Sequence, residues 1–187
     1  TVLALHPESE RLQRLSMEDQ FGCTALHCAA SSSNPESIRF LLGLYPEAER
    51  SHIVSDPHRD GCTVLHCAAR SGNPESLNTV LRIYPESEWL SAVRRQDQFG
   101  RTMLHYAANS TKIECLKTIL ALYPESERKQ AVSTQDTNRR TVLHSIAKTG
   151  NPESIKFILS HYPEERLQAV QVRDTIGRTA LHCVALS

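Results

Sequence analysis

Residues 58–96 read HRDGCTVLHCAARSGNPESLNTVLRIYPESEWLSAVRRQ, and the rest of the 187-residue chain repeats this 39-residue pattern. Prolines mark the period at residues 7, 46, 85, 124 and 163. Such a period indicates one supersecondary unit, stacked so that each copy buries its apolar face on its neighbours. The Thr-x-Leu-His motif occurs five times, with threonines 39, 39, 39 and 38 residues apart, at Thr24 and His27, Thr63 and His66, Thr102 and His105, Thr141 and His144, and Thr179 and His182.

Each unit predicts two antiparallel helices joined by a turn. Thr63 suits an N-cap, and the small and apolar residues over 65–69 predict a short first helix. Asn73 and Pro74 suit the cap and first position of a second helix, because proline lacks an amide that would be unpaired there. Residues 77–84 continue it with apolar side chains at i, i+3, i+4 and i+7, which is the stripe of a helix packed on one face.

A short third helix is predicted after each period proline. Pro85 stops the second helix, and the Pro-Glu-Ser-Glu sequence places carboxylates in a new first turn. An apolar residue seven or eight positions later should anchor this helix to the stack, and these anchors are Leu15, Val54, Val93, Val132 and Val170. Asp-x-x-Gly then forms a tight turn before the next unit, and no strand pattern of useful length appears.

The motif Asp-x-x-Gly-x-Thr-x-Leu-His-x-Ala-Ala followed by Gly-Asn-x-Glu-Ser resembles the ankyrin repeat along essentially the whole chain. The resemblance implies an all-α solenoid of L-shaped units with a concave face that binds proteins and with no catalytic activity. Three features depart from the family pattern. The proline usual between Thr and Leu is absent, and its positions hold Ala25, Val64, Met103, Val142 and Ala180. The turn glycine and aspartate are replaced in one copy each, by Arg139 and His58, and the period of 39 residues exceeds the usual value of about 33. The extra residues match the third helix. The enlarged repeats also resemble ankyrin arrays in effector proteins that intracellular bacteria inject into host cells.

We therefore predict one ankyrin-repeat domain over 1–187. It comprises a partial repeat 1–18, full repeats 19–57, 58–96, 97–135 and 136–173, and a partial repeat 174–187.

The repeat histidines are interpreted as structural. One histidine per unit places successive rings about 8–10 Å apart, so they cannot converge on one ion. We expect each to hydrogen-bond its own threonine or a neighbouring turn. The sets Cys23, His27, Cys28 and Cys62, His66, Cys67 are assigned no metal, since Cys-x₄-Cys is not the usual knuckle. Other copies hold unrelated residues there: Arg101 and Tyr106, Arg140 and Ser145, and Arg178 and Cys183. We predict no metal, no cofactor and no catalytic residue.

Positions that vary between copies at the turns and after the Ala-Ala pair are free for recognition. In ankyrin repeats these positions line the concave face. Phe21, Phe99 and Ile176 would be anchors at turn tips, or would tuck against the next turn. Arg101, Arg140 and Arg178 form an aligned basic row that either recognises a partner or is a solvated face. The predicted partner-binding residues are Phe21, Arg59, Arg70, Gln98, Phe99, Arg101, Asn138, Arg140, Lys148, Ile176 and Arg178.

Charge is balanced overall at 21 basic and 21 acidic residues, but it is unevenly distributed. Residues 1–93 carry 7 basic and 12 acidic side chains, whereas 94–187 carry 14 and 9. The basic half favours a protein or peptide partner of acidic character. Nucleic acid would require a larger basic excess with stacking aromatics, no segment is long and apolar enough for a membrane, and no phosphate-cradling loop indicates a small-molecule substrate.

The predicted function is a non-catalytic scaffold that binds a protein or peptide on its concave face. The alternative is a substrate-recruiting arm of a larger enzyme or bacterial effector whose catalytic domain lies outside this chain. The absence of a secretory signal and of a disulfide pattern predicts a cytoplasmic location, or the host cytosol for an effector. Apolar residues near both ends, such as Val2 and Leu181, suggest a fragment of a longer array or end-to-end pairing.

Overall fold

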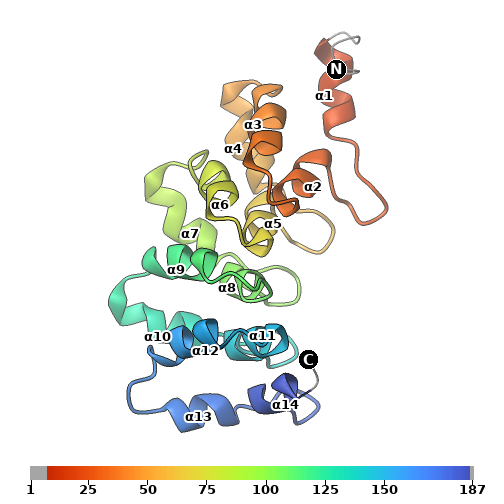
Figure 1. Ribbon diagram of the computed structural model, residues 1–187. Helices are drawn as coiled ribbons and strands as arrows, with labels where there is room; N and C mark the ends of the chain where they lie inside the picture. Colours follow the sequence, from red (N-terminus) through yellow and green to blue (C-terminus); the bar gives the residue numbers. More distant parts are fainter. Residues whose placement is uncertain (1–7, 186–187) are drawn as a thin grey trace.

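The computed structural model describes residues 8–185 and shows a single stack of helical tiers (Figure 1). Helices joined by turns and irregular loops make up these residues, and no strand occurs among them. The first helices of the tiers are α2 (Ala25–Ser31), α5 (Val64–Ser71), α8 (Met103–Ala107), α11 (Val142–Thr149) and α14 (Ala180–Val184). The second helices are α3 (Pro35–Gly43), α6 (Pro74–Leu81), α9 (Glu114–Ala121) and α12 (Pro152–Leu159).

The third helices confirm the predicted extra element of each unit. They are α1 (Glu8–Leu15), α4 (Glu47–Ser55), α7 (Trp89–Arg94), which follows the short 3₁₀ turn η2 (Glu86–Glu88), α10 (Glu125–Ser133) and α13 (Arg166–Gln171). In Figure 1, α7, α10 and α13 lie on the left side of the stack, away from the loops that precede the first helices, whereas α1 lies at the upper right. The predicted unit boundaries fall in these loops and stay a prediction.

Local sequence explains where the second helices begin. The side chains of Asn34, Asn73 and Asn151 each accept a hydrogen bond from the amide two residues later, and a proline occupies the first helical turn. The second helix of the third tier departs from this pattern, because Lys112 and Ile113 replace the asparagine and the proline, and α9 begins only at Glu114 without a side-chain cap.

Tiers are held together by apolar packing and by hydrogen bonds between turns. First helices pack on one another along the stack, α2 on α5, α5 on α8 and α11 on α14. Their leucines, such as Leu65 and Leu104, are fully buried. Backbone bonds then join successive turns, from Gln98 N–H to Asp60 O at 2.9 Å and from Thr137 N–H to Phe99 O at 2.8 Å. The turns therefore form a continuous edge on the side of the stack that carries the first helices.

Four of the five predicted anchors of the third helices are buried, and the fifth prediction was wrong. Leu15, Val54, Val93 and Val132 are buried, whereas Val170 is only half-buried and Ala169 is buried beside it. The reason lies in the next tier, whose tyrosine reaches the third helix of the tier before it. Tyr84 Oη, for example, donates to Val54 O at 3.0 Å, whereas among residues 8–185 only the first helix α14 follows α13, without a second helix to carry such a tyrosine.

Two remaining sequence features concern the turns and the chain ends. Arg139, which replaces the turn glycine, has φ of +60°, so it keeps the left-handed backbone that glycine has elsewhere. Pro7 and Val2 lie outside the described residues, and the side chain of Leu181 is exposed. Within residues 8–185, no helix has the length and apolarity to span a bilayer.

Candidate functional site

The Thr-x-Leu-His motif forms a capping box at the start of every first helix. In the third tier, Thr102 Oγ accepts from the backbone amide of His105, the third residue of α8. The ring returns the interaction, because His105 Nδ1 lies 3.2 Å from Thr102 N and 3.0 Å from Thr102 Oγ. All five copies have this arrangement.

The capping box also settles which ring nitrogen carries the proton. A backbone amide can only donate, so Nδ1 accepts and Nε2 carries the hydrogen. Nε2 then donates to a carbonyl of the following tier, from His105 to Arg140 O at 3.1 Å and from His144 to Arg178 O at 3.2 Å. His66 donates to Arg95 O at 3.2 Å instead. Burial lowers the pKa of His66 to about 4 and lowers that of His105, so these rings bind the stack as neutral groups.

Each tier has a second recurring cluster at its turn. In the third tier the buried Asp97 Oδ1 accepts from the amides of Phe99 and Arg101. Its other oxygen, Oδ2, accepts from Arg101 Nε and from Tyr106 Oη, both at 2.7 Å. Burial alone would raise the pKa of Asp97, but the hydrogen bonds from Tyr106 and Arg101 hold it below its ordinary value.

The same three positions in the second tier hold His58, Cys62 and Cys67. His58 Nδ1 takes over the role of the aspartate and accepts from the Asp60 amide at 3.1 Å. Cys62 Sγ and Cys67 Sγ lie 3.8 Å apart, and both side chains are about 3% exposed. The contact with Cys62 lowers the pKa of the Cys67 thiol, whereas the contact with Cys67 and burial raise the pKa of the Cys62 thiol.

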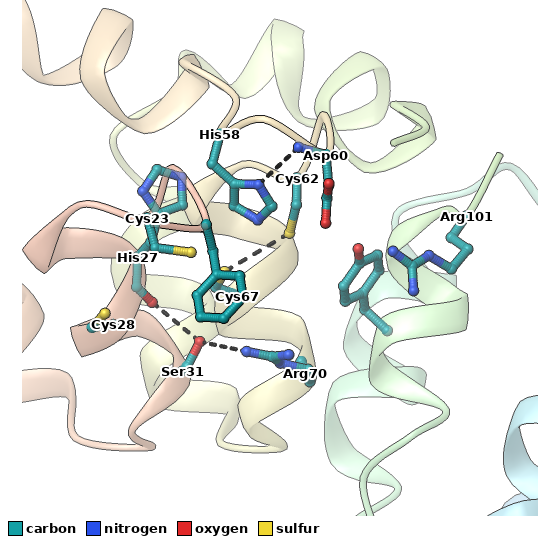
Figure 2. A pocket seen from close by; sticks show the side chains of 12 residues that line it. Cys23, His27, Cys28, Ser31, His58, Asp60, Cys62, Cys67, Arg70 and Arg101 are labelled. Atoms are coloured by element: carbon teal, nitrogen blue, oxygen red, sulfur yellow. Dashed lines mark hydrogen bonds between the residues drawn. The ribbon is translucent and has the colours of Figure 1, made fainter. Parts of the chain in front are cut away.

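These thiols line a cavity of about 560 Å³ between the first and second tiers (Figure 2). Cys23 and Cys28 of the first tier lie on one wall, and Arg70 closes another through a hydrogen bond to Ser31 Oγ at 3.1 Å. His27 Nε2 faces this region and is buried without a hydrogen-bond partner, unlike its equivalents in the next three tiers. A second hollow of about 280 Å³ lies around Phe99, Arg140 and Lys148.

A family model described as ankyrin repeats (3 copies) matches residues 2–88, 56–131 and 88–164. The chain belongs to the ankyrin repeat family. No curated protein matches it.

Most of the predicted partner-binding residues of this ankyrin array gather at the two hollows. Phe21, Arg70 and Arg101 line the first, and Phe99, Arg101, Asn138, Arg140 and Lys148 line the second. The others lie elsewhere along the turn edge. Arg59 donates to Gln20 O, Gln98 donates to Asp60 Oδ1, and Ile176 and Arg178 are exposed on the last turn.

Two arginines of the predicted basic row are engaged within the ankyrin stack. Arg101 pairs with the buried Asp97 and lies over the Phe99 and Tyr106 rings, with its guanidinium carbon 4.7 and 5.0 Å from their centroids. Arg140 Nε lies 3.3 Å from Asp174 Oδ2 across the tier boundary. Only part of the row is therefore free to meet another molecule.

His58 is a neighbour of the two cysteines that the sequence pattern did not predict. The pattern grouped Cys62 and Cys67 with His66, whose ring instead contacts Thr63 and Arg95 O. The missed signal was positional: Cys62 precedes the N-cap Thr63 and Cys67 is the fourth residue of α5, and residues at these two positions commonly touch. Four intervening residues are also within the range that zinc ligands use.

Proposed function

We propose that this chain binds a protein or peptide partner through its turn tips and first helices, and that it does so without catalysing a reaction. Ankyrin repeats are generally protein-interaction modules and typically non-catalytic. A preformed stack suits this role, because it loses little conformational freedom on binding.

The observation that carries the proposal is the exposure of large apolar side chains at the turn tips. Phe21 is 64% exposed and Ile176 is 62% exposed, although the residues around them pack tier on tier. Exposed apolar side chains beside arginine are typical of the residues that anchor protein interfaces. Phe99 contributes less, since it is 38% exposed and Arg101 covers one face of its ring.

Charge favours an acidic partner at the second hollow. Lys148 lines this hollow and is exposed, and Arg139 is exposed on the turn between the lining residues Asn138 and Arg140. In the described part of the chain, neither Arg139 nor Lys148 forms an ion pair with a carboxylate. A carboxylate from a partner could therefore pair with them without first breaking an internal contact, which is not true of Arg140.

The test uses single substitutions on this surface. The parent chain captures partners from an extract, and calorimetry then measures the affinity of each identified partner. Phe21→Ala and Lys148→Glu should each weaken binding at least about tenfold, in the range of interface anchors. Lys156→Glu is the matched control, because Lys156 is equally exposed but lies on the second helix α12. Parent-like affinity for both surface variants, or equal loss for Lys156→Glu, would contradict the proposed surface.

A further inference from the structure

Three side chains of the second tier converge at the positions equivalent to Asp97, Arg101 and Tyr106 of the third tier. The ligand-capable atoms of His58, Cys62 and Cys67 all lie within 4.8 Å of one another. Among the residues that the structure describes, no other three histidines, cysteines or acids come together in this way. Figure 2 shows the His58 ring above the pair of thiols at the back of the cavity.

The distance between the two thiols matches a metal site. Two zinc–sulfur bonds of about 2.3 Å at a tetrahedral angle place the sulfur atoms about 3.8 Å apart. Cys62 Sγ and Cys67 Sγ are separated by 3.8 Å. A disulfide would require about 2.05 Å, so the pair is held at the spacing that a shared ion bridges.

We propose that His58, Cys62 and Cys67 bind a thiophilic divalent cation, for which zinc is the best match, with the fourth coordination position open to the cavity. Thiolate sulfur with imidazole nitrogen is the donor set that zinc takes in proteins. The site is independent of the proposed partner-binding function, since it requires no other molecule.

Folding brings the ligands together before any ion arrives. The N-cap Thr63 fixes where α5 begins, and this places Cys62 directly before the helix and Cys67 in its first full turn. His58 is oriented by the Asp60 amide. In the third tier the equivalent positions close on themselves through bonds from Arg101 and Tyr106 to Asp97 at 2.7 Å. In the second tier, weaker sulfur contacts occupy the same space: Cys62 Sγ lies 3.8 Å from Cys67 Sγ and donates to Thr63 O at 3.8 Å.

The proton and charge balance of binding can be written out. A zinc ion bound by two thiolates and a neutral imidazole gives a site without net charge, and the two thiols release their protons to solvent. His58 Nδ1 already accepts a hydrogen bond, so Nε2 is the nitrogen left for the ion. Metal binding at Nε2 moves the ring proton to Nδ1. Nδ1 then no longer accepts from the Asp60 amide, so the metal–nitrogen bond replaces this hydrogen bond. Arg70 on the cavity wall opposes the cation, and the two thiolates outweigh it.

The experiment titrates the full reduced chain with Zn²⁺ in competition with a chromogenic chelator. We expect one equivalent bound with a Kd below about 1 µM, as for preformed structural sites. Co²⁺ added alone should give a sulfur-to-cobalt charge-transfer band together with the visible bands of a tetrahedral ion. Excess Zn²⁺ should remove both.

Four substitutions locate the ligands. Cys62→Ser, Cys67→Ser and His58→Asn should each weaken Zn²⁺ binding at least about 100-fold, as loss of a ligand does. Asparagine at position 58 can still accept the turn amide through its side-chain oxygen, so the fold is kept. Cys115→Ser is the control, because Cys115 is equally buried but lies on α9 away from the cavity. It should bind like the parent.

Two further readouts keep the outcome clear if a serine variant is unstable. Zn²⁺ should raise the thermal midpoint of the parent and of Cys115→Ser but not that of His58→Asn. Zn²⁺ should also protect Cys62 and Cys67 of the parent from alkylation, while Cys23 and Cys28 stay reactive. A Kd weaker than about 100 µM, parent-like affinity in His58→Asn, or protection of Cys23 and Cys28 instead would overturn the site.

Discussion

In the second, third and fourth tiers, the histidine of the Thr-x-Leu-His motif is held at both ring nitrogens. In the third tier Nδ1 of His105 accepts from Thr102 and Nε2 donates to Arg140 O. Glutamate or glutamine at the same helix position could complete the capping box but offers no ring to reach the next tier. The residue therefore joins local helix initiation to stacking, which is why the sequence repeats it.

Arg139 is a residue-scale weakness of the stack. Holding a residue that has a Cβ atom at φ of +60° costs about 1 kcal/mol, whereas glycine adopts this backbone conformation without strain. We predict that Arg139→Gly raises the free energy of unfolding by about 1 kcal/mol, measured by urea denaturation.

Gly100 provides the reverse control for this prediction. It has φ of +71°, and a Cβ added there would meet its nearest neighbour, Thr137 N, at an ordinary contact distance of 3.4 Å. Gly100→Ala should therefore lower stability by about 1 kcal/mol through backbone strain alone. If both variants had the stability of the parent, the turn backbone would not be under the constraint described here.

At the scale of elements, the added third helix is attached through the tyrosine that ends the next second helix. Tyr123 Oη donates to Val93 O at 3.1 Å, and Tyr84 makes the same bond to Val54 O. In the fourth tier Tyr162 instead accepts from Ser133 Oγ at 3.0 Å. The bonds from Tyr84 and Tyr123 give a donor to carbonyls at the carboxyl ends of α4 and α7, where the helix itself supplies none.

Removing one of these hydroxyls should loosen one joint between tiers. Tyr123→Phe is expected to lower the free energy of unfolding by about 1–2 kcal/mol, since Val93 O loses its donor. Tyr45→Phe is the matched control, because the hydroxyl of the equally buried Tyr45 makes no hydrogen bond within residues 8–185. It should remain within about 0.5 kcal/mol of the parent. Chemical denaturation of both variants measures the difference, and an equal effect would argue against the joint.

For the whole molecule, the column of buried histidines makes stability depend on pH. The pKa values of His27 and His66 fall to about 4 in the folded chain, mainly through burial, and that of His105 is also lowered. Unfolded histidine titrates near 6.5, so between these values the unfolded chain binds more protons. The stability that these neutral histidines contribute is therefore fully present above about pH 6.5 and is lost as the pH falls toward 4.

His105→Gln tests this column while preserving the capping box, because glutamine can serve at the same position. The parent should lose up to about 1.4 kcal/mol per pH unit for each such histidine between pH 6.5 and pH 4. The variant should lose less over that range in urea denaturation with chelator present. His52→Gln, at an exposed position on α4, should follow the parent. If the free energy of unfolding of His105→Gln fell with pH as steeply as that of the parent, the His105 ring would not contribute to the pH dependence.

The sequence by itself determined the repeat, its three helices and the ankyrin family, because each signal is local. A threonine cap, an Asn-Pro start and an apolar stripe act within a few residues and recur at a fixed period. The roles of Thr102 and His105 within one helix turn followed from the same local rules.

Only the tertiary structure decided which side chains meet across a tier. It pairs Arg140 with Asp174, brings the hydroxyl of Tyr123 to the carbonyl of Val93, and leaves Phe21 exposed. It also placed His58 beside Cys62 and Cys67, where sequence spacing had directed attention to His66. The physical reason is that periodicity specifies the helices and their order, whereas contacts between turns and neighbouring tiers depend on how the helices pack.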